Sequence, residues 1–315
     1  MDFHTSLKFH NMKPFRLTSL AILFFVFALN SLQAQTEQPV QSVPVPNTEQ
    51  RSFYSKVLGQ DIILMIKLPS RYYSSPQKQY HVWYFTDGNR SFPLVANIAS
   101  IFEMPLPQNP ELVIVSIAYK IRDMADWGAW RTRDLTPTNV ASIDTSWSGT
   151  LQMMTGRKFD VKTGGAGKFL DCIEQEIIPF IESNYRVMKT GRGLGGYSYG
   201  GLFSLYALFT RPGLFSTYYA GSPSIDYDKG FLFSLEKKSF DSHRDLNAKL
   251  FMSAGGEEDS TMVTNMKRMA AILESRKYTG LSVNSCVFPD ETHATCIPAS
   301  VMRAFEVLYY KNSTK

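Results

Sequence analysis

A serine stands between two glycines in the stretch Gly196-Tyr197-Ser198-Tyr199-Gly200, and this spacing constrains the fold more than any other feature of the chain. In such a pattern the serine typically occupies a sharp turn between a buried strand and a helix. Glycine is needed at positions 196 and 200 because a Cβ there would clash with the adjoining strand or helix. The turn exposes the Ser198 hydroxyl and directs the amide N–H of Tyr199 toward an oxyanion formed beside it. Ser198 is therefore a candidate nucleophile.

The residues on either side of this stretch favour the same interpretation. Residues 192–195 can form a short buried strand, and residues 202–209 are an apolar run of helical length that ends at Arg211-Pro212-Gly213. A Gly-rich turn with an unreactive serine is the alternative, and the strand–turn–helix context argues against it.

The rest of the chain alternates between apolar strands and helices. Apolar runs predict strands at 62–68, 80–85, 112–117, 217–221, 250–253 and 282–288, and helical spacing predicts helices at 169–185, 262–275 and 299–310. We therefore expect an α/β protein with a mostly parallel central sheet covered by helices on both faces. In such sheets the active groups lie on loops beyond the carboxyl ends of the strands.

Composition and segment boundaries indicate one catalytic domain. The chain has 315 residues, 44% hydrophobic and 19% charged, which is enough for a single large core at residues 51–312. Residues 35–50, with three prolines among polar residues, predict a disordered linker. Residues 131–168 are rich in Gly and Thr and show little periodicity, so we interpret them as a flap or cap loop beside the pocket. An ordinary surface loop is the alternative.

The N-terminal 34 residues predict a signal peptide. Basic residues precede an apolar stretch at 20–29, which is too short to span a membrane, and Ser31-Leu32-Gln33-Ala34 offers a cleavage site after Ala34. An uncleaved anchor is the alternative. We expect a periplasmic or secreted protein with no stable membrane insertion after cleavage.

The net charge and the cysteine content limit which ligands and which covalent bonds we expect. The formal charge is +5, without a basic run or an aromatic–Arg platform, so nucleic acid is not an expected partner. Among the three cysteines, Cys286 and Cys296 flank His293, and either a disulfide or two free thiols would fit. No cluster has metal-ligand spacing, and we expect neither a metal nor a cofactor. The sequence gives no indication of the oligomeric state.

A serine nucleophile requires a base and an acid. Of the histidines beyond the signal peptide, His81 begins a strand and His243 lies in a polar surface segment, whereas His293 directly follows the last strand, where the base belongs. The acid should follow the preceding strand, at Gly255-Gly256-Glu257-Glu258-Asp259. We favour Asp259, then Glu257, then Glu258; the carboxylates not used would lie at a solvated helix N-terminus.

Further residues are candidates for the pocket. Gly88 and Asn89 follow the strand at 80–85 and can bring a second N–H to the oxyanion, although a plain turn is the alternative. Arg131 and Arg133 can bind a substrate carboxylate or catecholate, but Arg133 can equally pair with Asp134 to hold the cap. Trp130 and two other tryptophans near the cap are candidates for an aromatic lining or for the core.

These residues resemble the putative-esterase family of α/β hydrolases, which includes esterase D, siderophore esterases, feruloyl esterases and mycolyltransferases. The resemblance extends over most of residues 50–310 and rests on five segments, at 83–89, 131–137, 196–203, 220–224 and 291–293. The Arg-x-Arg-Asp-Leu-Thr-Pro segment and the Ser-Pro-Ser segment resemble the siderophore-esterase branch in particular.

The resemblance implies hydrolysis of a carboxylic ester through an acyl-enzyme. Ser198 would be the nucleophile, His293 the base and then the acid, and the Tyr199 amide part of the oxyanion hole. Three carboxylates compete where the family usually offers one, and some siderophore esterases are described as working with a Ser–His dyad. The expected partner is a small-molecule ester, either a siderophore lactone or an aryl or acyl ester. An acyltransferase on this scaffold and a non-catalytic ligand-binding relative are the alternatives.

Overall fold

The computed structural model describes residues 43–103 and 111–310, together with Met1. Residues Val45–Lys315 group into one compact unit. The signal peptide expected at 1–34 lies, apart from Met1, outside the described residues, as does most of the linker expected at 35–50. The first strand begins at Thr48, so the end of that predicted linker belongs instead to the sheet.

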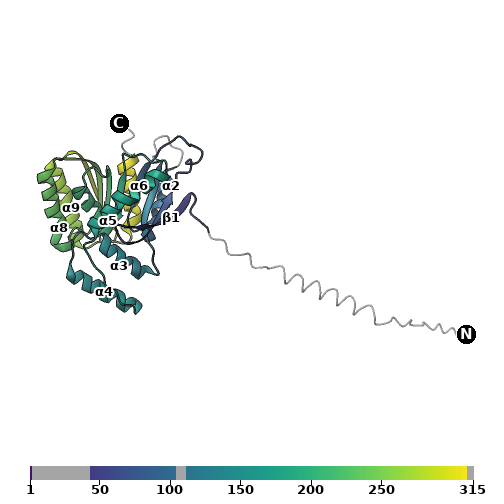
Figure 1. The fold of residues 1–315 in the computed structure, drawn as a ribbon, viewed down its shortest axis with the longest axis horizontal. Coiled ribbons are helices and arrows are strands. Elements are labelled where there is room, and N and C mark those ends of the chain that lie inside the picture. The colour runs from purple at the N-terminus through teal and green to yellow at the C-terminus, as the bar shows by residue number, and fades with distance from the viewer. Residues whose placement is uncertain (2–42, 104–110, 311–315) are drawn as a thin grey trace. The chain divides into compact units, whose positions relative to one another are not determined.

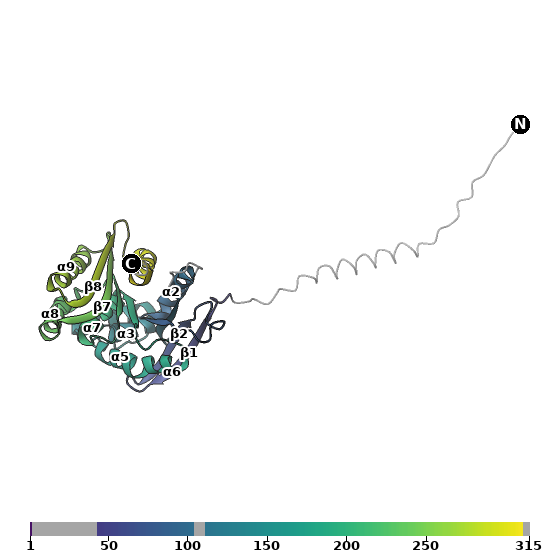
Figure 2. The same cartoon turned by 90° about the horizontal axis from the view of Figure 1, so that it is seen from above.

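Eight strands form one sheet (Figures 1 and 2). Its order is β1-β2-β4-β3-β5-β6-β7-β8, and only β1–β2 and β2–β4 pair antiparallel. The strands are β1 (Thr48–Ser55), β2 (Gln60–Lys67), β3 (His81–Phe85), β4 (Leu112–Tyr119), β5 (Gly193–Tyr197), β6 (Thr217–Gly221), β7 (Asp245–Gly255) and β8 (Thr279–Phe288). The sequence predicted every strand but β1, whose largely exposed residues carry no buried apolar run.

Helices cover both faces of the sheet. They are α2 (Gly88–Phe102), α3 (Met124–Asp134), α4 (Ala141–Thr155), α5 (Ala166–Cys172), α6 (Ile178–Asn184), α7 (Tyr199–Thr210), α8 (Tyr227–Ser242), α9 (Ser260–Arg276) and α10 (Cys296–Phe305). A π-helical turn, η1 (Ile173–Ile177), joins α5 to α6, and a second, η2 (Glu306–Tyr310), follows α10.

Successive strand residues point to opposite faces of the sheet and thereby divide the core into two clusters. Tyr84 belongs to the larger cluster, with apolar residues of α5 to α9, whereas its neighbours Trp83 and Phe85 belong to the smaller one, with α2 and α10. Figure 2 shows α2 and the C-terminal helix on one side of the sheet and α5 to α7 on the other. The predicted two-layered covering is confirmed.

The segment 131–168 is not a long loop. It contains the end of α3, all of α4 and the start of α5. Within α4 only Asp144 and Leu151 are buried, and the apolar residues Ile143, Trp147 and Leu151 recur every four residues, a helical spacing that the sequence-based prediction missed. We call residues 131–168 the cap. Within the described residues, no helix has both the length and the apolar character that crossing a membrane requires.

Candidate active site

The turn between β5 and α7 has the geometry expected of a nucleophile elbow. Ser198 adopts φ 61° and ψ −117°, a region that a non-glycine residue rarely occupies. A Cβ at Gly196 would lie 2.5 Å from the Gly200 carbonyl carbon, and one at Gly200 would lie 2.3 Å from Thr86 Oγ1. Both glycines are therefore required for the turn, as the sequence predicted. The Ser198 N–H donates to Gly221 O on the neighbouring strand at 2.8 Å, which ties the turn to the sheet.

His293 lies in the loop after β8 and is held by Glu258, which follows β7. His293 Nδ1 is 2.9 Å from Glu258 Oε2. The Glu258 side chain is fully buried, whereas the imidazole is 44% exposed. Burial raises the pKa of Glu258, but hydrogen bonds from His293, Ser222 and the Gly255 N–H outweigh it and bring the pKa below its usual value. Glu258 is thus a carboxylate at neutral pH, and its negative charge would stabilise an imidazolium.

The preference for Asp259 as the acid is wrong, because its side chain has another task. Asp259 is the N-cap of α9, and its carboxylate accepts a hydrogen bond from the Thr261 N–H at 2.8 Å. Glu257, the second choice, is exposed. The sequence carried a signal for this N-cap role, since Asp directly before a helix is a preferred N-cap residue.

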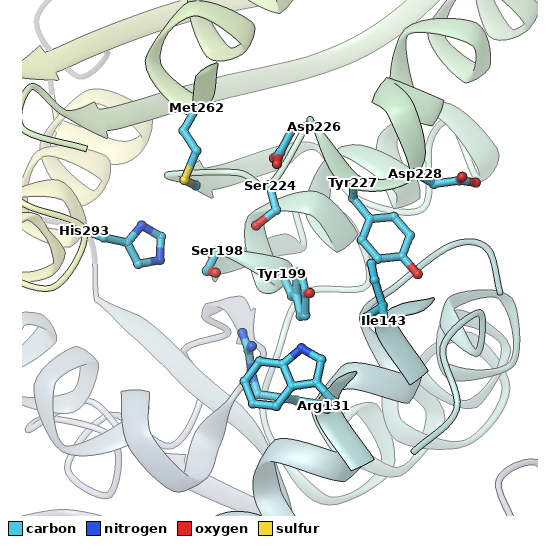
Figure 3. Close-up of a pocket in the computed structure, with 11 residues that line it drawn as sticks. Arg131, Ile143, Ser198, Tyr199, Ser224, Asp226, Tyr227, Asp228, Met262 and His293 are labelled. Carbon is cyan, nitrogen blue, oxygen red and sulfur yellow. The ribbon is translucent and has the colours of Figure 1, made fainter. Parts of the chain in front are cut away.

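Ser198 and His293 line one pocket of about 400 Å³. Figure 3 shows His293 and Ser198 on neighbouring parts of its wall, although they come from different loops. Cap residues Ile143 and Trp147 contribute to the lining, so the cap borders the pocket as expected. The remaining lining residues are Arg131, Tyr199, Ser224, Asp226, Tyr227, Asp228 and Met262.

The two candidate arginines are both engaged within the protein. Arg131 lines the pocket, but its guanidinium makes two hydrogen bonds to Asp87, at 2.7 and 2.9 Å, and lies over the rings of Trp127 and Tyr199. Arg133 binds Asp134 in the same bidentate way. The structure therefore favours the structural role for Arg133. The ion pair of Arg131 with Asp87 links the cap to the residues that follow β3.

Trp130 does not line the pocket that holds Ser198 and His293. Its ring stacks on the Arg133 guanidinium, 4.7 Å from the ring centroid, and it faces a separate surface hollow along α3. Trp147 is the tryptophan that reaches the pocket. The expectation for Trp130 fails because helix α3 turns that side chain outward, an orientation that sequence spacing alone did not fix.

The candidate oxyanion donors lie at two helix starts. Tyr199 is the first residue of α7, and Gly88 and Asn89 are the first two of α2. N–H groups in a first helical turn have no acceptor within the helix, so they are available to an anion. The Asn89 side chain is not available, because it exchanges hydrogen bonds with the backbone of Tyr119 at 2.9 and 2.8 Å.

The pocket that holds Ser198 is not lined by the cysteines, His81 or His243, although Cys296 lies close to Tyr197 and Glu258. Cys286 and Cys296 are free thiols, so the disulfide alternative is wrong. His81 begins β3, and His243 is an exposed residue at the end of α8, as expected. In the part of the chain that the structure describes, no three His, Cys, Asp or Glu side chains gather as metal ligands would.

Comparisons with known proteins agree with this geometry. Residues 136–287 match the sequence profile of the family described as Putative esterase. Ferri-bacillibactin esterase BesA of Bacillus subtilis is 30% identical over 273 residues, which cover 82% of this chain and 89% of that protein. The crystal structure of BES protein from Bacillus cereus has a TM-score of 0.74 at 27% identity and covers 88% of this chain and 100% of its own. An IroE-like serine hydrolase from Shewanella oneidensis has a TM-score of 0.70 at 27% identity, with 83% and 80% covered.

Proposed function

We propose, given that this chain belongs to the putative esterase family and is an esterase of the α/β-hydrolase fold, that it works through an acyl-enzyme formed on Ser198. One observation carries the proposal. Ser198, held at φ 61° on the elbow, shares a pocket with His293, whose other ring nitrogen is bound to the buried carboxylate of Glu258.

In the proposed mechanism His293 Nε2 removes the Ser198 proton while Ser198 Oγ bonds to the ester carbonyl carbon. The Tyr199 N–H stabilises the resulting oxyanion, with Gly88 or Asn89 as the second backbone donor. Collapse of this intermediate breaks the ester bond, and the leaving alcohol takes the proton from His293. Water then attacks the acyl group by the same steps, which releases the acid and restores Ser198. Glu258 keeps the Nδ1 proton in place and stabilises the imidazolium in each half-reaction.

We further propose a siderophore lactone, or a related aryl or acyl ester, as the substrate. BesA is named as a ferri-bacillibactin esterase, and a relative from Emericella nidulans that matches 47% of this chain is named as a siderophore enterobactin esterase. The rings of Trp147, Tyr199 and Tyr227 line the pocket and would pack against aromatic or extended acyl groups. A panel of siderophore trilactones, feruloyl sugars and short acyl esters would test this. Turnover of the short acyl esters alone would exclude the lactone and aryl substrates, and turnover of none of the three would contradict the proposal.

We also propose that the protein is exported. The apolar stretch at 20–29 and the small residue at Ala34 support export to the periplasm or beyond, with cleavage after Ala34. The mass of the mature protein from its native host tests this directly.

The nucleophile is tested with Ser198→Ala. We expect hydrolysis of p-nitrophenyl acetate and butyrate to fall by at least about 10³-fold, because no other group replaces the serine oxygen. A fluorophosphonate should label the wild type at Ser198 and leave the variant unlabelled.

Ser116→Ala is the matched control, since Ser116 is buried in β4 and its hydroxyl has no hydrogen-bond partner among the described residues. We expect it to keep wild-type turnover. Equal turnover in Ser198→Ala and the wild type would refute the assignment of the nucleophile.

A further inference from the structure

Behind the His293–Glu258 pair lie two hydroxyl groups to which the mechanism above gives no role. Ser222 Oγ is 2.5 Å from Glu258 Oε1 and 2.6 Å from the hydroxyl oxygen of Tyr197. Ser222 is 1% exposed. The Gly255 N–H donates to the same carboxylate oxygen at 2.7 Å, so Glu258 Oε1 accepts two hydrogen bonds and Oε2 faces His293.

Counting hydrogens fixes the direction of these bonds. The Ser222 hydroxyl has one hydrogen, and an ionised Glu258 can only accept, so that hydrogen must point to Glu258. The contact between Ser222 and Tyr197 is then made by the Tyr197 hydroxyl donating to Ser222 Oγ. A chain of donors therefore runs from Tyr197 through Ser222 to Glu258, and such chains strengthen each bond by polarisation.

The backbone at Ser222 is unusual in a way that serves this contact. Ser222 has φ 35°, which is uncommon for a residue other than glycine, and its N–H donates to Ser253 O at 2.8 Å. The preceding residue, Gly221, accepts the hydrogen bond from the Ser198 N–H. Gly221, which ends β6, thus holds the nucleophile with its carbonyl group, and Ser222, which follows β6, holds the acid with its side chain.

Tyr197 contributes from the strand before the nucleophile. Its ring packs against the imidazole of His293, with ring centroids 5.1 Å apart. A Cβ on Gly221 would approach within 2.5 Å of Tyr197 Cδ2, so the glycine leaves room for this ring.

We propose that Ser222 and Tyr197 are positioning residues, which hold the carboxylate of Glu258 in line with His293 Nδ1. The proposal rests on the proposed serine-esterase mechanism and adds to it two residues that lie behind Glu258. Without the chain, a buried carboxylate with no cation beside it would be held by the Gly255 N–H and His293 alone. Ser222 supplies the additional donor that keeps this group ionised and in one orientation.

The other titratable groups that face Glu258 do not ionise in the working range. They are Tyr197, Tyr219 and Cys296, and each has its pKa raised, chiefly by burial; that of Cys296 rises to about 11. Glu291 and Cys286 act on Cys296. The acid limb of the pH profile of kcat/KM therefore reports the coupled Glu258–His293 pair.

The sign of the expected shift follows from the donors. Hydrogen bonds to the carboxylate lower the pKa of Glu258, so removing the Ser222 donor makes Glu258 more basic. The pair then binds a proton more readily, and activity is lost at a higher pH as the solution is acidified. We expect the midpoint of the acid limb to rise by about half a unit to one unit in Ser222→Ala. We expect kcat to fall by roughly tenfold with KM little changed, because the orientation of His293 matters most in the transition state.

Two further variants separate this role from folding. Ser222→Gly also lacks the hydroxyl but accepts φ 35° without strain, so it should fold at least as well and show the same shift of the limb. Tyr197→Phe keeps the ring against His293 and removes only the outer donor, so it should show a smaller shift in the same direction. Added to Ser222→Ala, Tyr197→Phe should move the limb no further, because the chain is already broken.

Ser116→Ala and Tyr218→Phe are the matched controls, since each removes a buried sheet hydroxyl outside the chain of donors that runs from Tyr197 to Glu258. We expect both control variants to keep the wild-type midpoint of the acid limb in the pH profile of kcat/KM. An unmoved limb in Ser222→Ala and Ser222→Gly, while Ser198→Ala is inactive, would overturn the positioning role and leave the esterase mechanism standing. Full activity of Ser198→Ala would instead remove the proposed function on which the role depends.

Discussion

At the scale of single residues, adjacent carboxylates in one loop have separate tasks. Glu258 turns inward to His293 Nδ1, and Asp259 turns back to the first turn of α9. The difference comes from backbone direction: Gly255 and Gly256 make a tight turn whose Cβ positions would lie 2.2 and 2.3 Å from the carbonyl oxygens of Glu291 and Pro289. This turn brings the loop after β7 against the loop that carries His293.

The two carboxylates are separable by matched substitutions. Glu258→Gln keeps the size of the side chain but removes the charge that stabilises the imidazolium, so we expect kcat to fall by roughly 10²- to 10⁴-fold. Asp259→Asn should leave kcat unchanged, because Asn is also a good N-cap residue, whereas Asp259→Ala should lower the free energy of unfolding by about 1 kcal/mol. Esterase kinetics and urea denaturation measure these effects. Loss of activity in Asp259→Asn with full activity in Glu258→Gln would reverse the assignment.

At the scale of elements, α4 is held by a buried carboxylate as well as by apolar contacts. Its buried residue Asp144 accepts hydrogen bonds from the N–H and hydroxyl of Thr163, at 2.8 and 2.7 Å, and from Asn139 Nδ2 at 2.8 Å. This buried acceptor with three partners adds to the packing of Leu151 and Trp147 against the cluster of Ala125 and Val161. The same helix presents Ile143 and Trp147 to the pocket, so the position of a pocket wall depends on one carboxylate.

We therefore expect Asp144→Ala to loosen the cap. It leaves two Thr163 donors without their acceptor and removes the shortest hydrogen bond of the Asn139 amide, which should lower the free energy of unfolding by about 2 kcal/mol or more. KM should rise by roughly tenfold, because the wall formed by α4 moves. Limited proteolysis and steady-state kinetics test both effects.

Asp160→Ala is the control within the same cap. The Asp160 side chain is 78% exposed and pairs only with the exposed Lys162, so its removal should cost little. Equal protease sensitivity of the two variants would show that Asp144 does not hold α4.

At the scale of the whole molecule, four neighbouring parallel strands each end in one part of the site. Ser198 follows β5, Ser222 follows β6, Glu258 lies three residues beyond β7, and His293 lies in the loop after β8. Because the carboxyl ends of parallel strands meet at one edge of the sheet, residues almost one hundred positions apart in sequence share one pocket. All of them belong to the compact unit that begins at Val45.

This organisation predicts that the N-terminal segment is dispensable for the enzyme. A chain that begins at Gln35 should keep the thermal midpoint and the kcat/KM of the protein purified after export, because the elements and site described above all lie beyond residue 43. Mass spectrometry of the exported protein should show loss of residues 1–34. A mature protein that retains Met1, or a shortened chain that fails to fold, would contradict this prediction.

The sequence by itself determined the elbow and the kind of sheet, and it selected His293 for the base that we propose. A serine between two glycines favours the sharp turn from strand to helix. Apolar runs that alternate with helical spacing favour a mostly parallel sheet covered by helices. Only the tertiary structure decided among Glu257, Glu258 and Asp259, turned Trp130 away from the pocket, and set Ser222 and Tyr197 behind the acid. Local patterns record which residues a turn or a strand tolerates, whereas the direction of a side chain depends on contacts with residues far away in the sequence.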